Sequence, residues 1–280
     1  MKTEITNMTK THDIQQLLTG FIAEGTAFYE ELPQASMHKV MNEETAARLE
    51  AMTIPTDGRD PEAVYQEMKE DVYSSVLMVQ HPRSFACIPS SMSLVSWMGD
   101  VMTNLYNPHA SCEMNGPAVN LIEKKLIDWL CGLAGYPHET SGGLFVSGGS
   151  IANLTALTAA RDAKLTEQER TLGVVYVSDQ THSSVCKGLH IIGFRKDQIR
   201  IIASDEAFRM DIETLRKAVQ ADADAGRKPF AVVASAGTTN TGSVDPLAEI
   251  ANLCETYNMW MHVDGAYGAS ALLSDTQRKK

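Results

Sequence analysis

The sequence lacks paired cysteines and long apolar runs, and its basic residues are outnumbered by acidic ones. The five cysteines are an odd number and no two form a C-x-x-C pair, which argues against a disulfide framework or a thiolate zinc site. We therefore expect a cytoplasmic protein in a reducing compartment. No stretch approaches the roughly 18 apolar residues of a membrane span, and residues 1–10 lack the apolar core of a signal peptide.

The charge balance excludes two classes of partner. The chain has 35 acidic and 24 basic residues, which gives a formal net charge of −11 at pH 7. Such a surface repels nucleic acid and anionic membranes, so we expect neither as a partner. The charged fraction of 21% argues against a disordered chain, and 280 residues suffice for one large α/β domain with or without an arm.

The first part of the chain has a helical pattern with little β character. Apolar residues recur at helical spacing over 92–106 and 117–134. We predict a helical N-terminal segment or arm over residues 1–114 and a large domain over residues 115–280.

From residue 143 on, short β-rich apolar runs alternate with helical runs, which predicts a parallel sheet covered by helices on both faces. Ligands of such sheets bind at the carboxyl ends of the strands. Thr181-His182, Gly237–Thr239 and Asp264 lie at those ends. The strands are expected at residues 174–177, 200–203, 230–234 and 260–263.

The first candidate site is a run of small residues that opens a helix, Ser147-Gly148-Gly149-Ser150. Glycines let backbone N–H groups approach an anion, and a helix N-terminus adds partial positive charge. The run therefore predicts a phosphate cup, with an ordinary Gly-rich loop and Ser150 as the N-cap as the alternative. It is not G-x-G-x-x-G and no G-K-[ST] follows, which disfavours dinucleotides and nucleoside triphosphates.

Two ionisable side chains follow predicted strands. His182 could stack on a flat ring or relay protons, or it could be a satisfied histidine in a loop that caps a helix. Asp264 needs a partner, such as a pyridinium N–H, unless it caps the next helix. Ala266 and Gly268 leave room for a flat ring. His262 and Asp264 lack further clustered ligands, so no metal is predicted.

Gly237, Thr238 and Thr239 form either a small polar shelf or a simple turn after another strand. Together the four sites supply phosphate donors, a ring stacker, a hydroxyl shelf and a carboxylate for a ring nitrogen. Their occurrence at successive strand ends of one sheet predicts a pocket for pyridoxal 5'-phosphate (PLP), whose protonated ring nitrogen makes it an electron sink.

Six stretches carry a family resemblance: HPRSF, VSWMGDVMTNLYNPHA, GGLFVSGGSIANLTALTAARD, SDQTHSSV, AGTTNTGSVDPL and HVDGAYGASALL. They resemble the group II PLP-dependent amino-acid decarboxylases of fold type I, most of all the bacterial aromatic-L-amino-acid and tryptophan decarboxylases. The resemblance extends from about His81 to Leu273. It implies a fold type I large domain, with a mainly parallel sheet flanked by helices, after a helical N-terminal segment.

The resemblance also implies roles for residues of the cofactor pocket. Gly149 and Ser150 would bind the phosphate of PLP. His182 would stack on one face of the pyridine ring and Ala266 would pack on the other. Asp264 would pair with the ring nitrogen.

Further residues are implied at the edge of that pocket. Thr239 would lie beside the cofactor. Ser90 matches a position that contacts the amino-acid substrate. Phe85 and His109 lie in segments that line the substrate pocket in relatives, where we also expect the interface of a homodimer.

The resemblance has departures as well. The Schiff-base lysine of the family follows the HVD strand in a His-Lys motif, and a catalytic loop and small domain come later. We expect this chain, which stops at Lys280, to hold the cofactor pocket without that lysine and without the C-terminal part of the fold. Near the substrate, HPRSF and PSSMS replace the usual HPRFF and PGPAS, and Cys112-Glu113-Met114 replaces a Gly-rich run.

The expected activity of the full-length parent is PLP-dependent decarboxylation of an L-amino acid, aromatic by resemblance, to the amine and CO₂. Two alternatives remain open. The chain could be a truncated, non-catalytic fragment of such an enzyme. The fold could also perform a different PLP reaction, such as aldehyde synthesis or a lyase reaction on a sulfur substrate.

Overall fold

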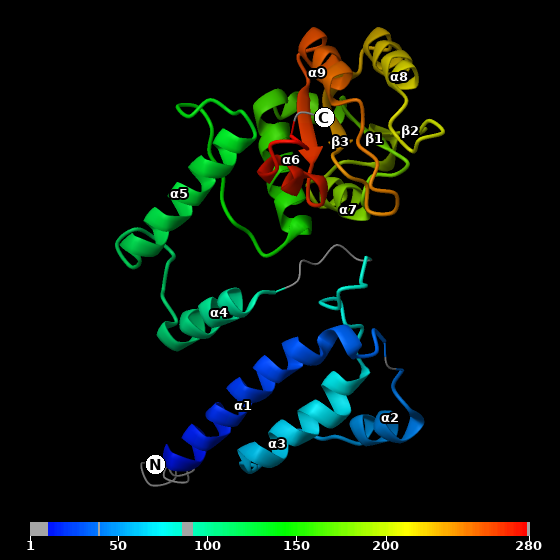
Figure 1. Cartoon of the computed structure of the whole chain (residues 1–280). Helices are drawn as coiled ribbons and strands as arrows, with labels where there is room; N and C mark the ends of the chain where they lie inside the picture. The colour runs from blue at the N-terminus through cyan, green and yellow to red at the C-terminus, as the bar shows by residue number, and fades with distance from the viewer. Residues whose placement is uncertain (1–10, 39, 86–91, 279–280) are drawn as a thin grey trace. The chain divides into compact units, whose positions relative to one another are not determined.

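The computed structural model describes residues 11–38, 40–85 and 92–278 (Figure 1). The chain divides into two compact units, Met1–Asn107 and Pro108–Lys280. This division falls a few residues before the boundary expected between residues 114 and 115. Each unit is described by itself.

The described part of the first unit is mainly helical, as its sequence pattern predicts. Asp60 caps one helix, accepting from the backbone N–H of Ala63, and Pro61 occupies the first turn, where its missing N–H costs nothing. A π-helical turn, Met68–Val72, extends that helix. The helices are α1 (Thr11–Glu31), α2 (Glu43–Glu50), α3 (Pro61–Glu67) and α4 (Leu94–Tyr106).

The second unit contains a four-stranded parallel sheet in the order β2-β1-β3-β4 (Figure 1). Its strands are β1 (Gly173–Ser178), β2 (Ile199–Ile202), β3 (Lys228–Ser235) and β4 (Trp260–Asp264). Its helices are α5 (Pro117–Leu133), α6 (Gly149–Lys164), α7 (Ser183–Ile191), α8 (Ile212–Asp224) and α9 (Leu247–Thr256). The predicted α/β class and its four strands are confirmed, each strand within a few residues of its expected range.

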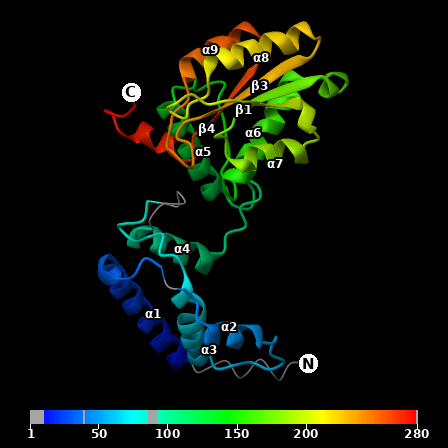
Figure 2. The ribbon, with the colours of Figure 1, turned by 90° about the vertical axis from the view of Figure 1, so that its right-hand side faces the viewer.

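Both faces of the central strand β1 are buried. Val174 and Tyr176 of β1 pack in one apolar cluster with residues of α8 and α9, while Val175 and Val177 pack in another with residues of α6 and α7. Successive side chains of a strand point to opposite faces, so β1 is apolar throughout. Figure 2 shows these two helix pairs on opposite sides of the sheet.

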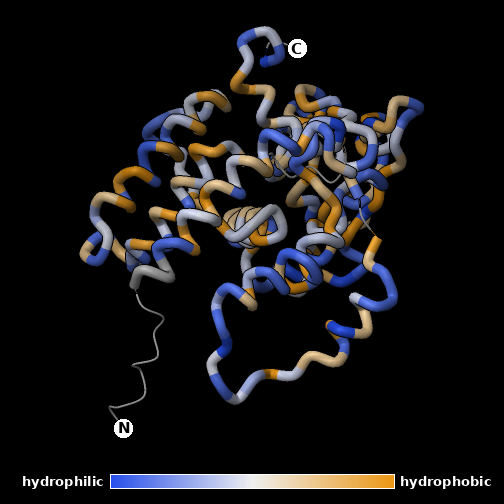
Figure 3. The backbone as a smooth tube through the Cα atoms, turned by 60° about the horizontal axis from the view of Figure 1, so that its bottom comes forward, coloured by the Kyte–Doolittle hydropathy of each residue, from blue (hydrophilic) through white to orange (hydrophobic). Residues whose placement is uncertain are grey.

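Apolar and polar residues alternate along the helices (Figure 3), which is typical of helices that bury one side. No helix in the described ranges is both long and apolar enough to cross a membrane. Because the strands are parallel, their carboxyl ends meet at one edge of the sheet. The loops after β1, β3 and β4 therefore start at the same edge.

A buried carboxyl group ties two of the loops at this edge together. Asp245 is 2% exposed, and its two oxygens accept hydrogen bonds from the backbone N–H groups of Met210 and Ser235, both at 2.7 Å. Burial raises the pKa of the Asp245 carboxyl, and the two backbone N–H groups oppose that rise. Asp245 thereby fixes the end of the loop after β3 against the segment before α8.

We expect Asp245→Asn to destabilise the fold by about 1–3 kcal/mol, because its NH₂ group would face a buried N–H and leave that donor without an acceptor. The free energy of unfolding, measured in urea, tests this. Asp211→Asn is the matched control: Asp211 also accepts from a backbone N–H, that of Thr214, but at a helix N-cap where asparagine serves equally well. Equal losses in the two variants would contradict the assignment.

Candidate active site

The predicted phosphate cup is the N-terminus of α6. Gly148 is the N-cap residue and has φ +134, a conformation that favours glycine, so Ser150 is not the N-cap as the alternative interpretation had it. Gly149 and Ser150 form the first turn and are exposed. The first N–H groups of an α-helix have no partner within the helix, so this turn can bind an anion.

His182 follows β1 and is the N-cap residue of α7. Its Nδ1 atom accepts a hydrogen bond from the backbone N–H of Ser184 at 3.3 Å and lies 2.7 Å from the Ser184 hydroxyl. The alternative interpretation, a histidine in a loop that caps a helix, therefore holds for the Nδ1 atom. The residue is nevertheless exposed, so the rest of the ring can meet a ligand.

Asp264 is the last residue of β4 and is half-buried. Its Oδ1 atom accepts from the backbone N–H of Ala266 at 3.1 Å, and its Oδ2 atom accepts from the Asn153 side-chain amide at 3.0 Å. The next helical turn has Tyr267 at its N-cap, so Asp264 does not cap it and that alternative is wrong. Both donors are neutral, so among the residues that the structure describes this carboxylate has no cationic hydrogen-bond partner.

Asn153, in the interior of α6, connects these elements. Its side chain is buried, and its Nδ2 atom donates to Asp264 Oδ2 and to Ser184 Oγ, each at 3.0 Å. Its Oδ1 atom lies 2.8 Å from His262 Nε2. One amide thus joins α6 to the start of α7 and to the end of β4. Sequence reasoning missed Asn153 and Ser184; the signal for Asn153 is an asparagine within a helix, where this residue type is unfavourable without a partner.

His262 lies two residues before Asp264 on β4. Burial lowers the pKa of His262, although the Asp264 carboxylate opposes this shift. The imidazole is a hydrogen-bond partner of Asn153, and the described residues contain no group of three or more His, Cys, Asp or Glu that could hold a metal.

The predicted polar shelf lies in the loop after β3. Thr238 is buried and its Oγ1 atom accepts from the backbone N–H of Ser243 at 3.1 Å, whereas Thr239 is exposed at the sheet edge. Gly268 donates its N–H to the Ala236 carbonyl oxygen at 2.8 Å, and a Cβ at Gly268 would collide with that oxygen. The expectation that Gly268 leaves room for a ring is therefore corrected: it lets two backbone segments meet.

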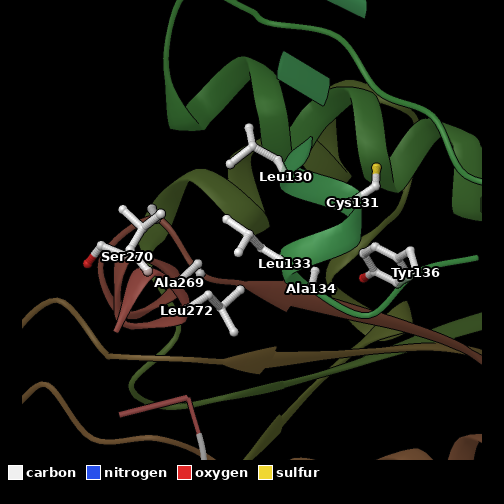
Figure 4. A pocket seen from close by; sticks show the side chains of 11 residues that line it. Leu130, Cys131, Leu133, Ala134, Tyr136, Ala269, Ser270 and Leu272 are labelled. Atoms are coloured by element: carbon white, nitrogen blue, oxygen red, sulfur yellow. The ribbon is translucent and has the colours of Figure 1, made fainter. Parts of the chain in front are cut away.

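A cavity of about 470 Å³ adjoins Gly265 and Ala266. Its other walls come from the end of α5, with Leu130 and Leu133, and from the turn after β4, with Leu272 (Figure 4). The lining is mostly apolar. Its members are far apart in the sequence, which is why periodicity did not predict the cavity.

The candidate substrate residues fall in different parts of the chain. Phe85 belongs to the first unit and is 95% exposed. His109 belongs to the second unit, where its Nδ1 atom lies 3.1 Å from the side-chain amide of Asn115. Ser90 lies outside the described residues. Their roles stay predictions.

Comparison with known proteins decides the family. The model of the pyridoxal-dependent decarboxylase conserved domain matches residues 44–280. The chain belongs to this family. The resemblance inferred from its six sequence stretches is confirmed.

Two curated relatives illustrate the match. The chain is 42% identical over 223 residues to an aromatic-L-amino-acid decarboxylase of Bacillus atrophaeus, covering 80% of this chain and 46% of that protein. It is 35% identical over 221 residues to an L-2,4-diaminobutyrate decarboxylase of Rhizobium meliloti, covering 79% and 44%. The chain thus spans less than half the length of these relatives.

Solved structures share the fold. A Rhodiola rosea 4-hydroxyphenylacetaldehyde synthase aligns with a TM-score of 0.87 at 26% identity, over 99% of this chain and 61% of that chain. An Oryza sativa TDC, solved with PLP and tryptamine, aligns with a TM-score of 0.85 at 28% identity, over 97% and 58%.

The lowered pKa of His262 predicts a pH dependence of folding. The unfolded chain binds a proton at this imidazole more readily than the folded chain does. The neutral imidazole of His262 therefore makes its full contribution to the free energy of unfolding above the pKa of the unfolded chain, about 6.5. That contribution is lost as the pH falls toward the pKa of the folded chain. The free energy of unfolding should fall more steeply below about pH 6.5 in the wild type than in His262→Gln, which cannot titrate there. Equal slopes in this range would contradict the shift.

Proposed function

We propose that this chain forms the cofactor-binding part of a PLP-dependent enzyme that converts an L-amino acid, aromatic in the first instance, to its amine and CO₂. Family membership and the named activity of the Bacillus atrophaeus relative support the reaction class. The observation that carries the proposal is the Asp264 carboxylate at the end of β4, which is half-buried and held by two neutral donors.

The carboxylate suits a cationic ring nitrogen. A carboxylate can accept about four hydrogen bonds, and the two that Asp264 accepts leave capacity for a pyridinium N–H. PLP, when bound, supplies an electron sink for the electron pair left at the substrate Cα when CO₂ departs. Asp264 would keep the proton on the ring nitrogen, because a neighbouring opposite charge favours the protonated ring.

The other residues would bind and orient the cofactor. Gly149 and Ser150, in the first turn of α6, would hold the phosphate through backbone N–H groups and a hydroxyl. His182 would stack on one face of the ring and Ala266 would pack on the other. The exposed Thr239 would lie beside it.

Three further features belong to this proposal. Phe85, Ser90 and His109 would contact the substrate.

A homodimer is favoured by large apolar side chains exposed on α4, among them Val95 at 78% and Leu105 at 74%. A cytoplasmic location is favoured by cysteines that sequence spacing leaves unpaired, and the net charge of −11 disfavours nucleic acid and anionic membranes.

Aldehyde synthesis is the second candidate reaction. The similarity to the Rhodiola rosea synthase over 99% of this chain favours considering it. The two reactions differ in product, so the amine-to-aldehyde ratio formed by the complete protein from an aromatic amino acid separates them. Amine as the main product supports decarboxylation, and aldehyde as the main product replaces it.

We expect Asp264→Asn, in the complete protein, to retain PLP but to lose several orders of magnitude in turnover. An amide cannot hold the positive charge on the ring nitrogen, and loss of CO₂ needs that charge. Product release under saturating PLP measures turnover, and the absorbance of bound PLP is the control for cofactor content. Near-normal turnover would remove this role from Asp264.

We expect Ser150→Ala to weaken PLP binding without altering the chemistry. Losing one hydrogen bond to a charged phosphate costs about 1.5–3 kcal/mol, which corresponds to a roughly 10- to 150-fold higher Kd. Saturating PLP should then restore most of the activity. Thr158→Ala removes a hydroxyl about two turns further along the same helix and should leave the PLP titration unchanged. Identical titrations for wild type and Ser150→Ala would contradict the phosphate site.

A further inference from the structure

The orientation of the Asn153 amide follows from its neighbours. An amide has one end that only donates and one that only accepts. Asp264 Oδ2, a carboxylate oxygen 3.0 Å away, can only accept, so it must face the NH₂ end. The Asn153 carbonyl oxygen therefore points to His262 Nε2, at 2.8 Å.

This orientation determines where His262 carries its proton. The Asn153 carbonyl oxygen cannot donate, so the hydrogen bond forms only if Nε2 bears the hydrogen. Burial lowers the pKa of His262 and favours the neutral ring. The neutral ring then has its single N–H at Nε2, and Nδ1 is left without a proton.

The same amide acts on His182 through Ser184. Asn153 Nδ2 donates to Ser184 Oγ at 3.0 Å, which leaves the Ser184 hydroxyl hydrogen free to point at His182 Nδ1, 2.7 Å away. The Ser184 backbone N–H also donates to that nitrogen. His182 Nδ1 is thus an acceptor, and in the neutral ring the proton lies on Nε2.

We propose that Asn153 is a positioning residue that orients the Asp264 carboxylate and sets the protons of His262 and His182 on their Nε2 atoms. Its bearing on catalysis rests on the proposed function, in which Asp264 meets the ring nitrogen and His182 meets the ring face. A single amide then couples the group proposed to meet the ring nitrogen with the group proposed to stack on the ring face.

The geometry leaves little freedom in the residue type at position 153. An aspartate there would have no hydrogen to give Asp264 or Ser184 and would place two carboxylates side by side. An alanine would leave the half-buried His262 N–H without its acceptor. The asparagine supplies two donors and an acceptor within one buried side chain.

The proton positions are measurable without any cofactor. Long-range ¹H–¹⁵N correlation spectra of the whole chain, labelled with ¹⁵N-histidine, distinguish protonated from bare ring nitrogens. His262→Gln and His182→Gln assign the signals. At about pH 8, where a histidine of ordinary pKa is neutral, both rings should carry hydrogen on Nε2 only. A hydrogen on Nδ1 of His262 or of His182 would overturn the proposal, whatever the variants do.

Three variants then separate positioning from stability. Asn153→Asp should raise the pKa of His262 by roughly 1–3 pH units, because it adds a negative charge beside the ring. Asn153→Ala should end the exclusive Nε2–H form of His262 and shift the Nδ1 resonance of His182. Ser184→Ala should shift only His182, because it leaves the Asn153–His262 bond in place.

The matched control is Leu157→Ala, one turn further along α6. Leu157 is fully buried in the apolar cluster against β1, so its truncation weakens packing without removing a hydrogen bond. Its histidine spectra should match those of the wild type. If His262 has the same tautomer and pKa in Asn153→Ala and Asn153→Asp as in Leu157→Ala, Asn153 does not position these groups.

This experiment is independent of the proposed function. The spectra report on the protein alone, whereas a titration of the wild-type chain with PLP reports on the cofactor site. If the rings carry Nε2–H and respond to substitution of Asn153 but the wild type binds no PLP, the result supports the positioning role and counts against the cofactor proposal. If the wild type binds PLP but the rings do not respond to substitution of Asn153, the result supports the cofactor proposal and counts against the positioning role.

Discussion

Where helices bury both faces of the central strands of a parallel sheet, polar side chains gather mainly where those strands end. In this chain β1 and β3 are apolar along most of their length, because α6 and α7 cover one face and α8 and α9 the other. Buried polar groups need hydrogen-bond partners, so each polar group at the sheet edge must find one locally. The candidate site depends on this constraint: its ionisable groups sit at strand ends, and short hydrogen bonds between loops hold them there.

The amide of Asn153 meets that constraint for several groups at once. It gives a hydrogen bond to the carboxylate at the end of β4, one to the hydroxyl at the start of α7, and it faces the half-buried imidazole of β4. Each of these elements is already fixed by apolar packing against the sheet. The hydrogen bonds of Asn153 therefore orient these side chains rather than hold the elements together. A site that holds a flat, charged ring requires such orientation.

The sequence predicted the parts of this molecule that follow from periodicity and local chemistry. The four strands and the position of Asp264 follow from short apolar runs and the polar residues after them. Asn153 was not predicted, because its partners lie far from it in sequence and only the packing of α6 against β4 brings them together. The role of Gly268 was misjudged for the same reason, since contact with Ala236 depends on how two loops cross. Periodicity reveals which face a residue occupies, but not which distant side chain it meets.

Two carboxyl groups at the same sheet edge show how burial separates a structural role from one in ligand binding. Asp245 and Asp264 each accept two hydrogen bonds from neutral N–H donors, so their partners alone do not distinguish them. Asp245 is 2% exposed, and burial raises its pKa. Its oxygens bind backbone N–H groups and are not accessible to a ligand. Asp264 is half-buried and accepts only two hydrogen bonds from the described residues, so it keeps acceptor capacity open. A carboxylate that is oriented by the protein but not neutralised by it is suited to a cation that arrives from outside, and the ring nitrogen of PLP is such a group.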